Sequence, residues 1–175
     1  LLSVIAFVVL YLWIQETRDY NNLLRLNKDL ADSHEQLKQA EIDTIASLVK
    51  AVEAKDRYTS GHSERVTRLA LAIADEMNLD EETKAIVARA GILHDIGKIG
   101  IKDEILYKVE ALTEDDWSTI KKHPDEAVKI LEPLRFLTDV RDVVRAHHER
   151  CDGRGYPEGL KDSQIRLESQ ILAVA

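Results

Sequence analysis

The stretch that decides the fold is residues 81–98, which read EETKAIVARAGILHDIGK. We expect a helix over residues 81–96, with Gly97 as its C-terminal cap. The last turn carries His94 and Asp95 side by side in an apolar context, where an unpaired imidazole would cost free energy. The stretch therefore predicts a helix with a chemical site at its end.

The segments on either side also predict helices. Ser60 could cap a helix whose apolar residues form a stripe. Thr113 begins a capping box, Thr-Glu-Asp-Asp, and Pro124 suits the first turn of a helix that runs to about Leu131. Residues 151–159 are dense in Gly, Asp and Pro and predict a loop. Because no strand pattern competes anywhere, we expect an all-α helical bundle.

The N-terminal part predicts a membrane segment followed by a signalling helix. Apart from one serine, residues 1–14 are apolar, and Tyr11 and Trp13 stand where interfacial aromatic side chains belong. We interpret residues 1–15 as the C-terminal part of a transmembrane helix; a buried core helix or a signal-peptide core are the alternatives. Residues 16–41 carry a heptad-like leucine stripe, which predicts a coiled-coil linker in a parallel homodimer rather than a solvated helix.

Charge and cysteine content narrow the partners. The net charge is −8 without a strong basic cluster, which argues against a nucleic acid polymer as partner. A small anionic substrate remains compatible if a metal supplies the positive charge. The single cysteine, Cys151, excludes a disulfide framework and fits a reducing compartment. No base points to it, so we interpret it as a loop thiol rather than a nucleophile.

Five of the six histidines fall in the domain that we expect over residues 42–175. They are His62, His94, His123, His147 and His148, and the sixth, His34, has no assigned role. A lone histidine is more often a surface or hydrogen-bonded core residue than a ligand, but five in one domain need a common explanation. Metal binding provides one, and Asp95 could bridge two ions. Lys98 could bind a phosphate oxygen, although it would otherwise be an exposed lysine.

At these residues the sequence resembles the HD-GYP family of bacterial cyclic-dinucleotide phosphodiesterases, within the HD superfamily of metal-dependent phosphohydrolases. The resemblance covers residues 42–175. Its motifs, in order, are Thr59-Ser60-Gly61-His62-Ser63, His94-Asp95-Ile96-Gly97-Lys98, Lys98-Ile99-Gly100-Ile101, Lys122-His123-Pro124, His147-His148-Glu149-Arg150, Asp152-Gly153 and Gly155-Tyr156-Pro157. It implies an HD-type helical domain that binds divalent ions, usually iron or manganese.

The resemblance also implies residue roles. The implied ligands of the first ion are His62, His94 and Asp95. Asp95 would bridge to a second ion, whose other implied ligands are His123, His147 and His148. Lys98 would contact the substrate phosphate. Arg154 and the Gly155-Tyr156-Pro157 loop would shape contacts with the substrate or with a protein partner.

The implied reaction is hydrolysis of cyclic di-GMP to pGpG or GMP by hydroxide that two metal ions activate. Two alternatives remain open, another HD-type nucleotide phosphohydrolase and a non-catalytic signalling or docking module. Family members with three ions carry Glu four residues before the first His, where this chain has Tyr58, so we expect two ions.

The family places a further metal-ligating Asp after an apolar run such as residues 171–175. We therefore expect this chain to be a C-terminally truncated piece of a longer bacterial protein. The missing ligand favours inactivity of the piece itself. The membrane segment predicts attachment to the inner membrane, with the catalytic domain in the cytoplasm.

Overall fold

The computed structural model describes residues 2–55 and 61–175, and every regular element in these ranges is a helix. The prediction of an all-α fold is therefore confirmed. The chain divides into two compact units, Leu1–Thr44 and Ile45–Ala175. Ser60 and Tyr58, on which a helix cap and the number of ions were predicted, lie outside the described residues.

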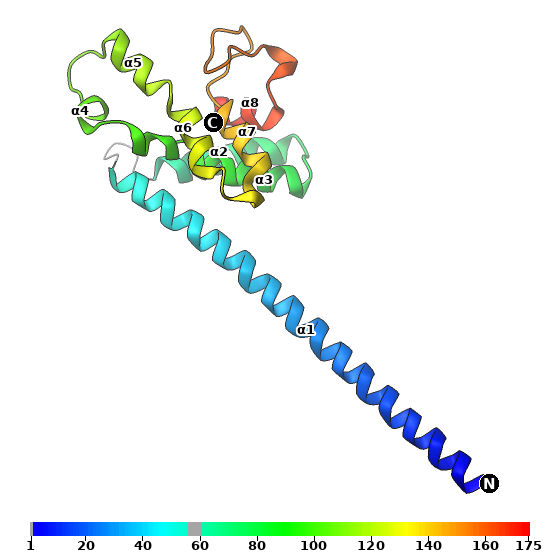
Figure 1. The fold of residues 1–175 in the computed structure, drawn as a ribbon. Coiled ribbons are helices and arrows are strands. Elements are labelled where there is room, and N and C mark those ends of the chain that lie inside the picture. Colours follow the sequence, from blue (N-terminus) through cyan, green and yellow to red (C-terminus); the bar gives the residue numbers. More distant parts are fainter. Residues whose placement is uncertain (1, 56–60) are drawn as a thin grey trace. The chain divides into compact units, whose positions relative to one another are not determined.

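The first unit belongs to α1 (Leu2–Lys55), a single uninterrupted helix (Figure 1). Its large apolar side chains between Val4 and Ile14 are each at least 48% exposed. None of the described helices is long and apolar enough to cross a membrane. The membrane segment at residues 1–15 and the coiled coil at residues 16–41 stay predictions.

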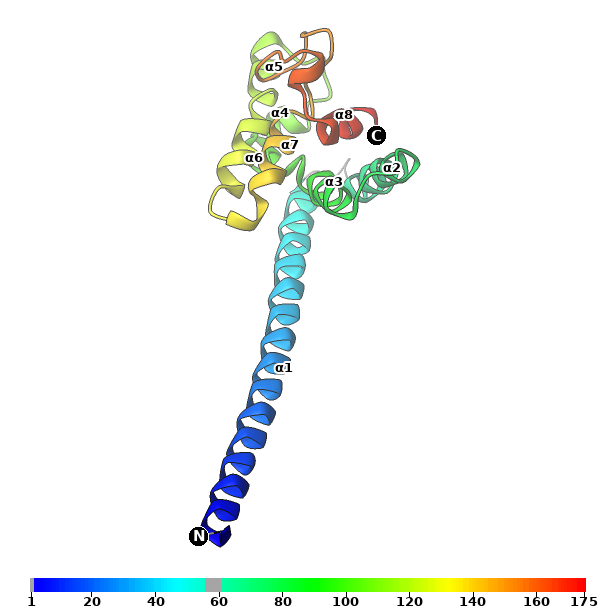
Figure 2. The same cartoon turned by 90° about the vertical axis from the view of Figure 1, so that its right-hand side faces the viewer.

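The second unit is a helical bundle built around α3 (Glu81–Leu93). This helix packs against α2 (His62–Glu76), α7 (Thr138–Arg145) and α8 (Leu167–Val174). A further helix, α6 (His123–Leu131), packs against α7, and Figure 2 shows these two side by side. Two of the partner helices, α7 and α8, are distant from α3 in sequence, so separate parts of the chain meet around one helix.

The core of this unit consists of apolar side chains from all of these helices. Burial of each Val, Leu or Ile side chain contributes about 1.5–3 kcal/mol. The apolar residues of α2, α3, α6, α7 and α8 that lie in this core cluster are Ala70, Val87, Ala90, Leu93, Ala127, Leu131, Val140, Val143, Val144, Ile171 and Leu172. The bundle therefore fixes the ends of its helices relative to one another.

Local signals explain where the shorter elements begin. Thr113 caps α5 (Glu114–Ile120) by accepting the Asp116 N–H, and the Asp116 carboxylate accepts the Thr113 N–H in return. Pro124 stands in the first turn of α6, which ends at Leu131. The predicted capping box at Thr113 and the predicted helix with Pro124 in its first turn are both confirmed. The remaining short elements are α4 (Asp103–Leu106), η2 (Arg135–Leu137) and η3 (Asp162–Gln164).

The prediction that Gly97 caps a helix over residues 81–96 is wrong. The helix ends at Leu93, and Gly97 lies inside a 3-10 helix, η1 (Ile96–Gly100). A Cβ at Gly97 would lie 1.9 Å from the carbonyl oxygen of His123 and 2.7 Å from the amide nitrogen of Ala127. Gly97 is therefore required by the close approach of η1 to the start of α6, rather than by a left-handed cap.

Candidate metal centre

The helical bundle brings the predicted ligand residues together at the ends of its helices. His62 is the first residue of α2, and His123 is the first residue of α6. His94 and Asp95 directly follow α3. His147 and His148 follow α7, which ends at Arg145. Because these helices pack on one another, their ends converge on one place in the second unit.

The first ligand set consists of His62, His94 and Asp95. The candidate ligand atoms of this set all lie within 4.8 Å of one another. The Nε2 atom of His94 lies 3.2 Å from Asp95 Oδ2, and that of His62 lies 3.9 Å from the same oxygen. His94 and Asp95 are buried, whereas the side chain of His62 is 38% exposed.

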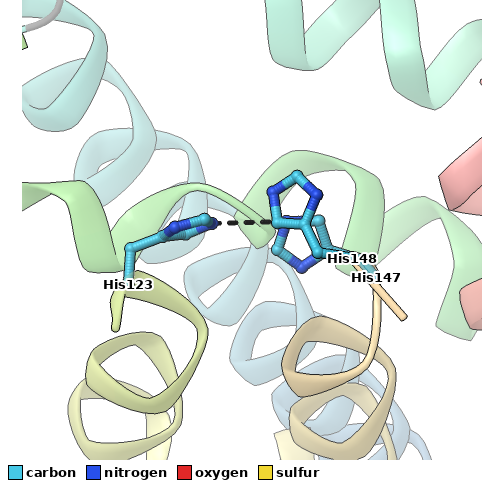
Figure 3. A group of neighbouring side chains, drawn as sticks. All are labelled: His123, His147 and His148. Atoms are coloured by element: carbon cyan, nitrogen blue, oxygen red, sulfur yellow. Dashed lines mark hydrogen bonds between the residues drawn. The ribbon is translucent and has the colours of Figure 1, made fainter. Parts of the chain in front are cut away.

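The second ligand set consists of His123, His147 and His148 (Figure 3). Its candidate ligand atoms also lie within 4.8 Å of one another, and the ring centroids are 4.0–5.3 Å apart. The other carboxylate oxygen of Asp95, Oδ1, lies 3.6 Å from His123 Nε2. Asp95 therefore directs one oxygen toward each set, as a bridging carboxylate would.

Carbonyl groups at helix ends fix the orientation of three imidazole rings. The Nδ1 atom of His94 lies 2.8 Å from the carbonyl oxygen of Gly91, three residues earlier. In the same way, the Nδ1 atom of His123 lies 2.8 Å from the carbonyl oxygen of Ile120, and that of His147 lies 2.5 Å from the carbonyl oxygen of Val144. These carbonyls belong to the last turns of α3, α5 and α7, where carbonyls lack partners within the helix.

This arrangement leaves Nε2 as the free ligand atom of each of the three rings. A carbonyl oxygen only accepts hydrogen bonds, so each Nδ1 carries the proton. In a neutral ring, Nε2 then presents its lone pair. Metal-binding histidines usually donate their second ring N–H to a carbonyl or a carboxylate in this way. The tautomers therefore suit metal ligation.

One contact in the second set favours a bound cation. The Nε2 atoms of His123 and His147 lie 3.4 Å apart, and both rings are almost fully buried. Both Nδ1 atoms already donate to carbonyls, so two lone pairs face each other. A divalent ion that accepts both lone pairs would turn this repulsive contact into a stable one. The residues present therefore fit metal ions.

The surroundings keep most of these ligands neutral. Burial lowers the pKa of His62, His123 and His147, and the positive charges of neighbouring groups add to the effect. Burial and the neighbouring His123 lower the pKa of His148 to about 4. Neutral imidazole is the form that binds metal, so these environments favour ligation over protonation.

Asp95 and His94 shift each other's pKa in opposite directions. Burial raises the pKa of Asp95, but the hydrogen bonds and charges of His94 and Lys98 outweigh it and hold that pKa well below its usual range. Burial lowers the pKa of His94, whereas the hydrogen bond and charge of Asp95 raise it more, so the net pKa is raised. Lys98 donates a hydrogen bond to Asp95 Oδ2 at 2.7 Å. The Asp95 carboxylate is therefore ionised.

A model of the HD domain family matches residues 46–175 of this chain. The chain belongs to the HD domain family. The resemblance seen in the sequence is thus confirmed, and the match covers the entire histidine cluster.

Three curated relatives extend this result. The chain is similar to the cyclic di-GMP phosphodiesterase response regulator RpfG of Xanthomonas campestris, with 38% identity over 87% of this chain and 41% of the relative. A cyclic di-GMP phosphodiesterase of Thermotoga maritima is 41% identical over 70% of this chain and 34% of the relative. A 3'3'-cGAMP-specific phosphodiesterase of Vibrio cholerae is 35% identical over 86% of this chain and 33% of the relative. The chain spans about two fifths or less of the length of these relatives.

The predicted loop of the HD domain lies directly against the second ligand set. The Tyr156 ring stacks on the His148 ring, with centroids 4.7 Å apart and an interplanar angle of 27°. The ammonium group of Lys121 lies 5.7 Å from the centre of the Tyr156 ring. The Tyr156–Pro157 peptide bond is cis. Arg154 is exposed, and its backbone N–H donates to the Asp152 carboxylate.

Glu149 is a feature of the site that the sequence did not single out. It is only 3% exposed, although it is an acidic residue, and it directly follows His148. Its carboxylate accepts the backbone N–H groups of Glu158, Gly159 and Leu160 at 2.6–3.0 Å. The sequence signal that could have pointed to Glu149 is its position directly after His147 and His148. An acidic residue at that position is, however, equally compatible with a solvent-exposed side chain. Cys151 is exposed on the loop, as expected.

Proposed function

We propose that the protein that contains this HD domain hydrolyses a phosphodiester bond of cyclic di-GMP, releasing pGpG or GMP. The observation that carries the proposal is the pair of ligand sets that share Asp95, with Lys98 beside them. Relatives named as cyclic di-GMP phosphodiesterases support the substrate class.

The chain's own residues have distinct tasks in this proposal. His62, His94 and Asp95 would hold one divalent ion. His123, His147 and His148 would hold the second, with Asp95 between the two. When bound, two such ions would supply the charge that acidifies water near neutral pH and stabilises the phosphate in the transition state. Iron and manganese both suit a set of imidazole and carboxylate ligands without thiolates.

Lys98 would contribute positive charge next to the reacting phosphate. Its ammonium group lies 2.7 Å from Asp95 Oδ2, so it is anchored where the two ligand sets meet. A lysine ammonium binds a phosphate oxygen as a point charge, and charge in place before the reaction stabilises the transition state without reorganisation.

The choice among cyclic dinucleotides rests on the relatives. Two of those described are named for cyclic di-GMP and one for 3'3'-cGAMP. The two substrates share the phosphodiester bonds on which the metal centre would act and differ in one base. Both therefore belong in the assay, and we propose cyclic di-GMP as the better substrate.

We further propose that α1 connects this domain to the inner membrane and to a second copy of the chain. Exposed apolar side chains support both parts of the proposal. Residues 4–14 are apolar around the helix, which suits lipid, and the more widely spaced Leu23, Leu26, Leu30 and Leu37 suit a coiled-coil seam. The domain would then lie in the cytoplasm, and a change in helix register would control its activity.

The direct test of the enzymatic proposal is a hydrolysis assay on the intact protein with Mn²⁺ or Fe²⁺. We expect metal-dependent conversion of cyclic di-GMP to pGpG or GMP, and loss of this activity when His94 and Asp95 are both replaced by Ala. Wild-type turnover by the double variant would contradict the assignment. A wild-type protein that binds cyclic di-GMP without hydrolysing it would favour a docking module instead.

A further inference from the structure

We propose that Glu149 is a positioning residue that sets the place of His148 in the second ligand set by holding the 151–160 loop against it. The inference rests on the proposed metal centre and deepens it. It concerns the residues of this chain that determine whether the second set can form.

His148 differs from the other two ligands of its set. A helix-end carbonyl holds the Nδ1 atom of His123 and that of His147. Among residues 61–175, no hydrogen bond is described for the ring of His148. Its described contacts are with the rings of His123, His147 and Tyr156. The orientation of His148 therefore depends on packing, and Tyr156 is the packing partner outside the ligand set.

Tyr156 is in turn fixed by the backbone of the loop. Its N–H donates to the carbonyl oxygen of His148 at 3.2 Å. The preceding Gly155 approaches so closely that a Cβ there would lie 2.4 Å from Glu149 Cα and 2.4 Å from the Arg150 amide nitrogen. The loop thus returns to the segment that carries the two histidines, and a glycine is required at the point of contact.

Glu149 holds the part of the loop that follows Tyr156 in the sequence. One carboxylate oxygen accepts the N–H groups of Glu158 and Gly159, and the other accepts that of Leu160. All three donors are backbone groups, so the carboxylate fixes the path of the chain after Pro157. Glu149 is also the residue next to His148. A shift of the loop relative to Glu149 therefore moves Tyr156 relative to the His148 ring.

The test compares Glu149→Gln with Glu158→Gln in the intact protein. In the first variant an amide replaces the Glu149 carboxylate, so an NH₂ donor would face a backbone N–H donor while the shape is kept. Glu158 is the matched control because its own carboxylate binds the Arg145 guanidinium on the protein surface. Circular dichroism establishes that both variants are folded.

The readouts are stepwise Mn²⁺ affinity and the rate of trypsin cleavage after Arg154. In Glu149→Gln we expect binding of the second ion to weaken about 10- to 100-fold, as for other residues that orient metal ligands, while the first ion is unaffected. We also expect faster cleavage of the metal-free loop. Glu158→Gln should retain both ions with wild-type affinity.

Tyr156 provides an independent second test. Tyr156→Ala should weaken the second ion while Glu149 still protects the loop after Tyr156, and Tyr156→Phe should restore wild-type affinity because the ring remains. Wild-type affinity for both ions in Glu149→Gln and Tyr156→Ala would overturn the inference and leave the proposed function intact. A wild-type protein that binds no second ion would overturn both.

Discussion

The two ligand sets are held in place by different forces. The first set contains a carboxylate with two close polar partners, His94 and Lys98, and its outer member, His62, is partly open to solvent. The second set contains three imidazoles, and it is held by burial, by ring contacts, by the stacked Tyr156 and by the carbonyl groups that accept from His123 and His147. The first set is organised by charge and the second by packing.

This difference predicts different sensitivities. Electrostatic attraction tolerates small displacements, because it changes gradually with distance. Ring packing and ligand direction are lost over much shorter displacements. The second set should therefore depend more on the surrounding loop, whereas the first should depend more on Asp95 and its neighbours. Asp95 directs one carboxylate oxygen toward each set, so it lies where the two kinds of organisation meet.

The largest effect is expected at that shared residue. Asp95→Asn keeps the shape but removes the charge that both sets use, so we expect hydrolysis of cyclic di-GMP to fall at least about 1000-fold, or about 4 kcal/mol. The measurement is product formation by chromatography. Asp115→Asn, an equivalent change at an exposed position on α5, should leave the rate unchanged. Equal rates in the two variants would refute the bridging role.

The next effect concerns the junction between the sets, where η1 meets α6. Gly97→Ala would place a methyl group against the backbone of His123, so we expect a loss of about 3 kcal/mol in the free energy of unfolding, at the upper end for overpacking. Gly100→Ala is the control, because nothing lies within 4 Å of a Cβ there. Urea unfolding of the metal-free proteins measures both, and similar stabilities would contradict the close approach.

A pair of ligand variants separates the two sets. His94→Ala removes a ligand of the first set and His148→Ala a ligand of the second. Loss of a direct ligand should weaken metal binding at least as much as loss of a residue that orients a ligand. Each variant should therefore bind one ion more than about 100-fold more weakly and retain the other. Metal content after Mn²⁺ loading should fall from two ions per chain to one in each. Loss of both ions in both variants would show that the sets are not separable.

The smallest effect is expected at Lys98. Lys98→Gln removes the ammonium group but leaves both ligand sets complete, so we expect both ions to bind and kcat/KM to fall about 10- to 100-fold, or about 1.4–2.8 kcal/mol. Steady-state kinetics on cyclic di-GMP measure this loss. Unchanged kinetics would remove Lys98 from the substrate site.

The sequence predicted the fold class from local signals, and its resemblance to the HD-GYP family predicted which side chains would gather at the candidate site. The capping box at Thr113 and the helix that begins near Pro124 are set by side chains within a few residues of each other. The clustering of the five histidines followed from their position in motifs. Such signals need no knowledge of the packing between distant segments.

The remaining features depend on contacts between segments that are distant in sequence. Gly97 read as a helix cap, yet its role is set by the start of α6, in a later segment of the chain. The sequence assigned no role to Glu149, yet its side chain is buried and accepts backbone N–H groups from residues 158–160. The carbonyl that orients each of three imidazoles is local, but only the folded helix ends show that it is available.

The central claim is that two adjacent metal ions share Asp95, each held by one ligand set. Anomalous diffraction from a crystal of the Mn²⁺-loaded protein tests it most directly. We predict two anomalous peaks, one beside His62 and His94 and the other among the three histidines of the second set, with the Asp95 carboxylate touching both. A single peak, or two peaks of which only one contacts Asp95, would contradict the account.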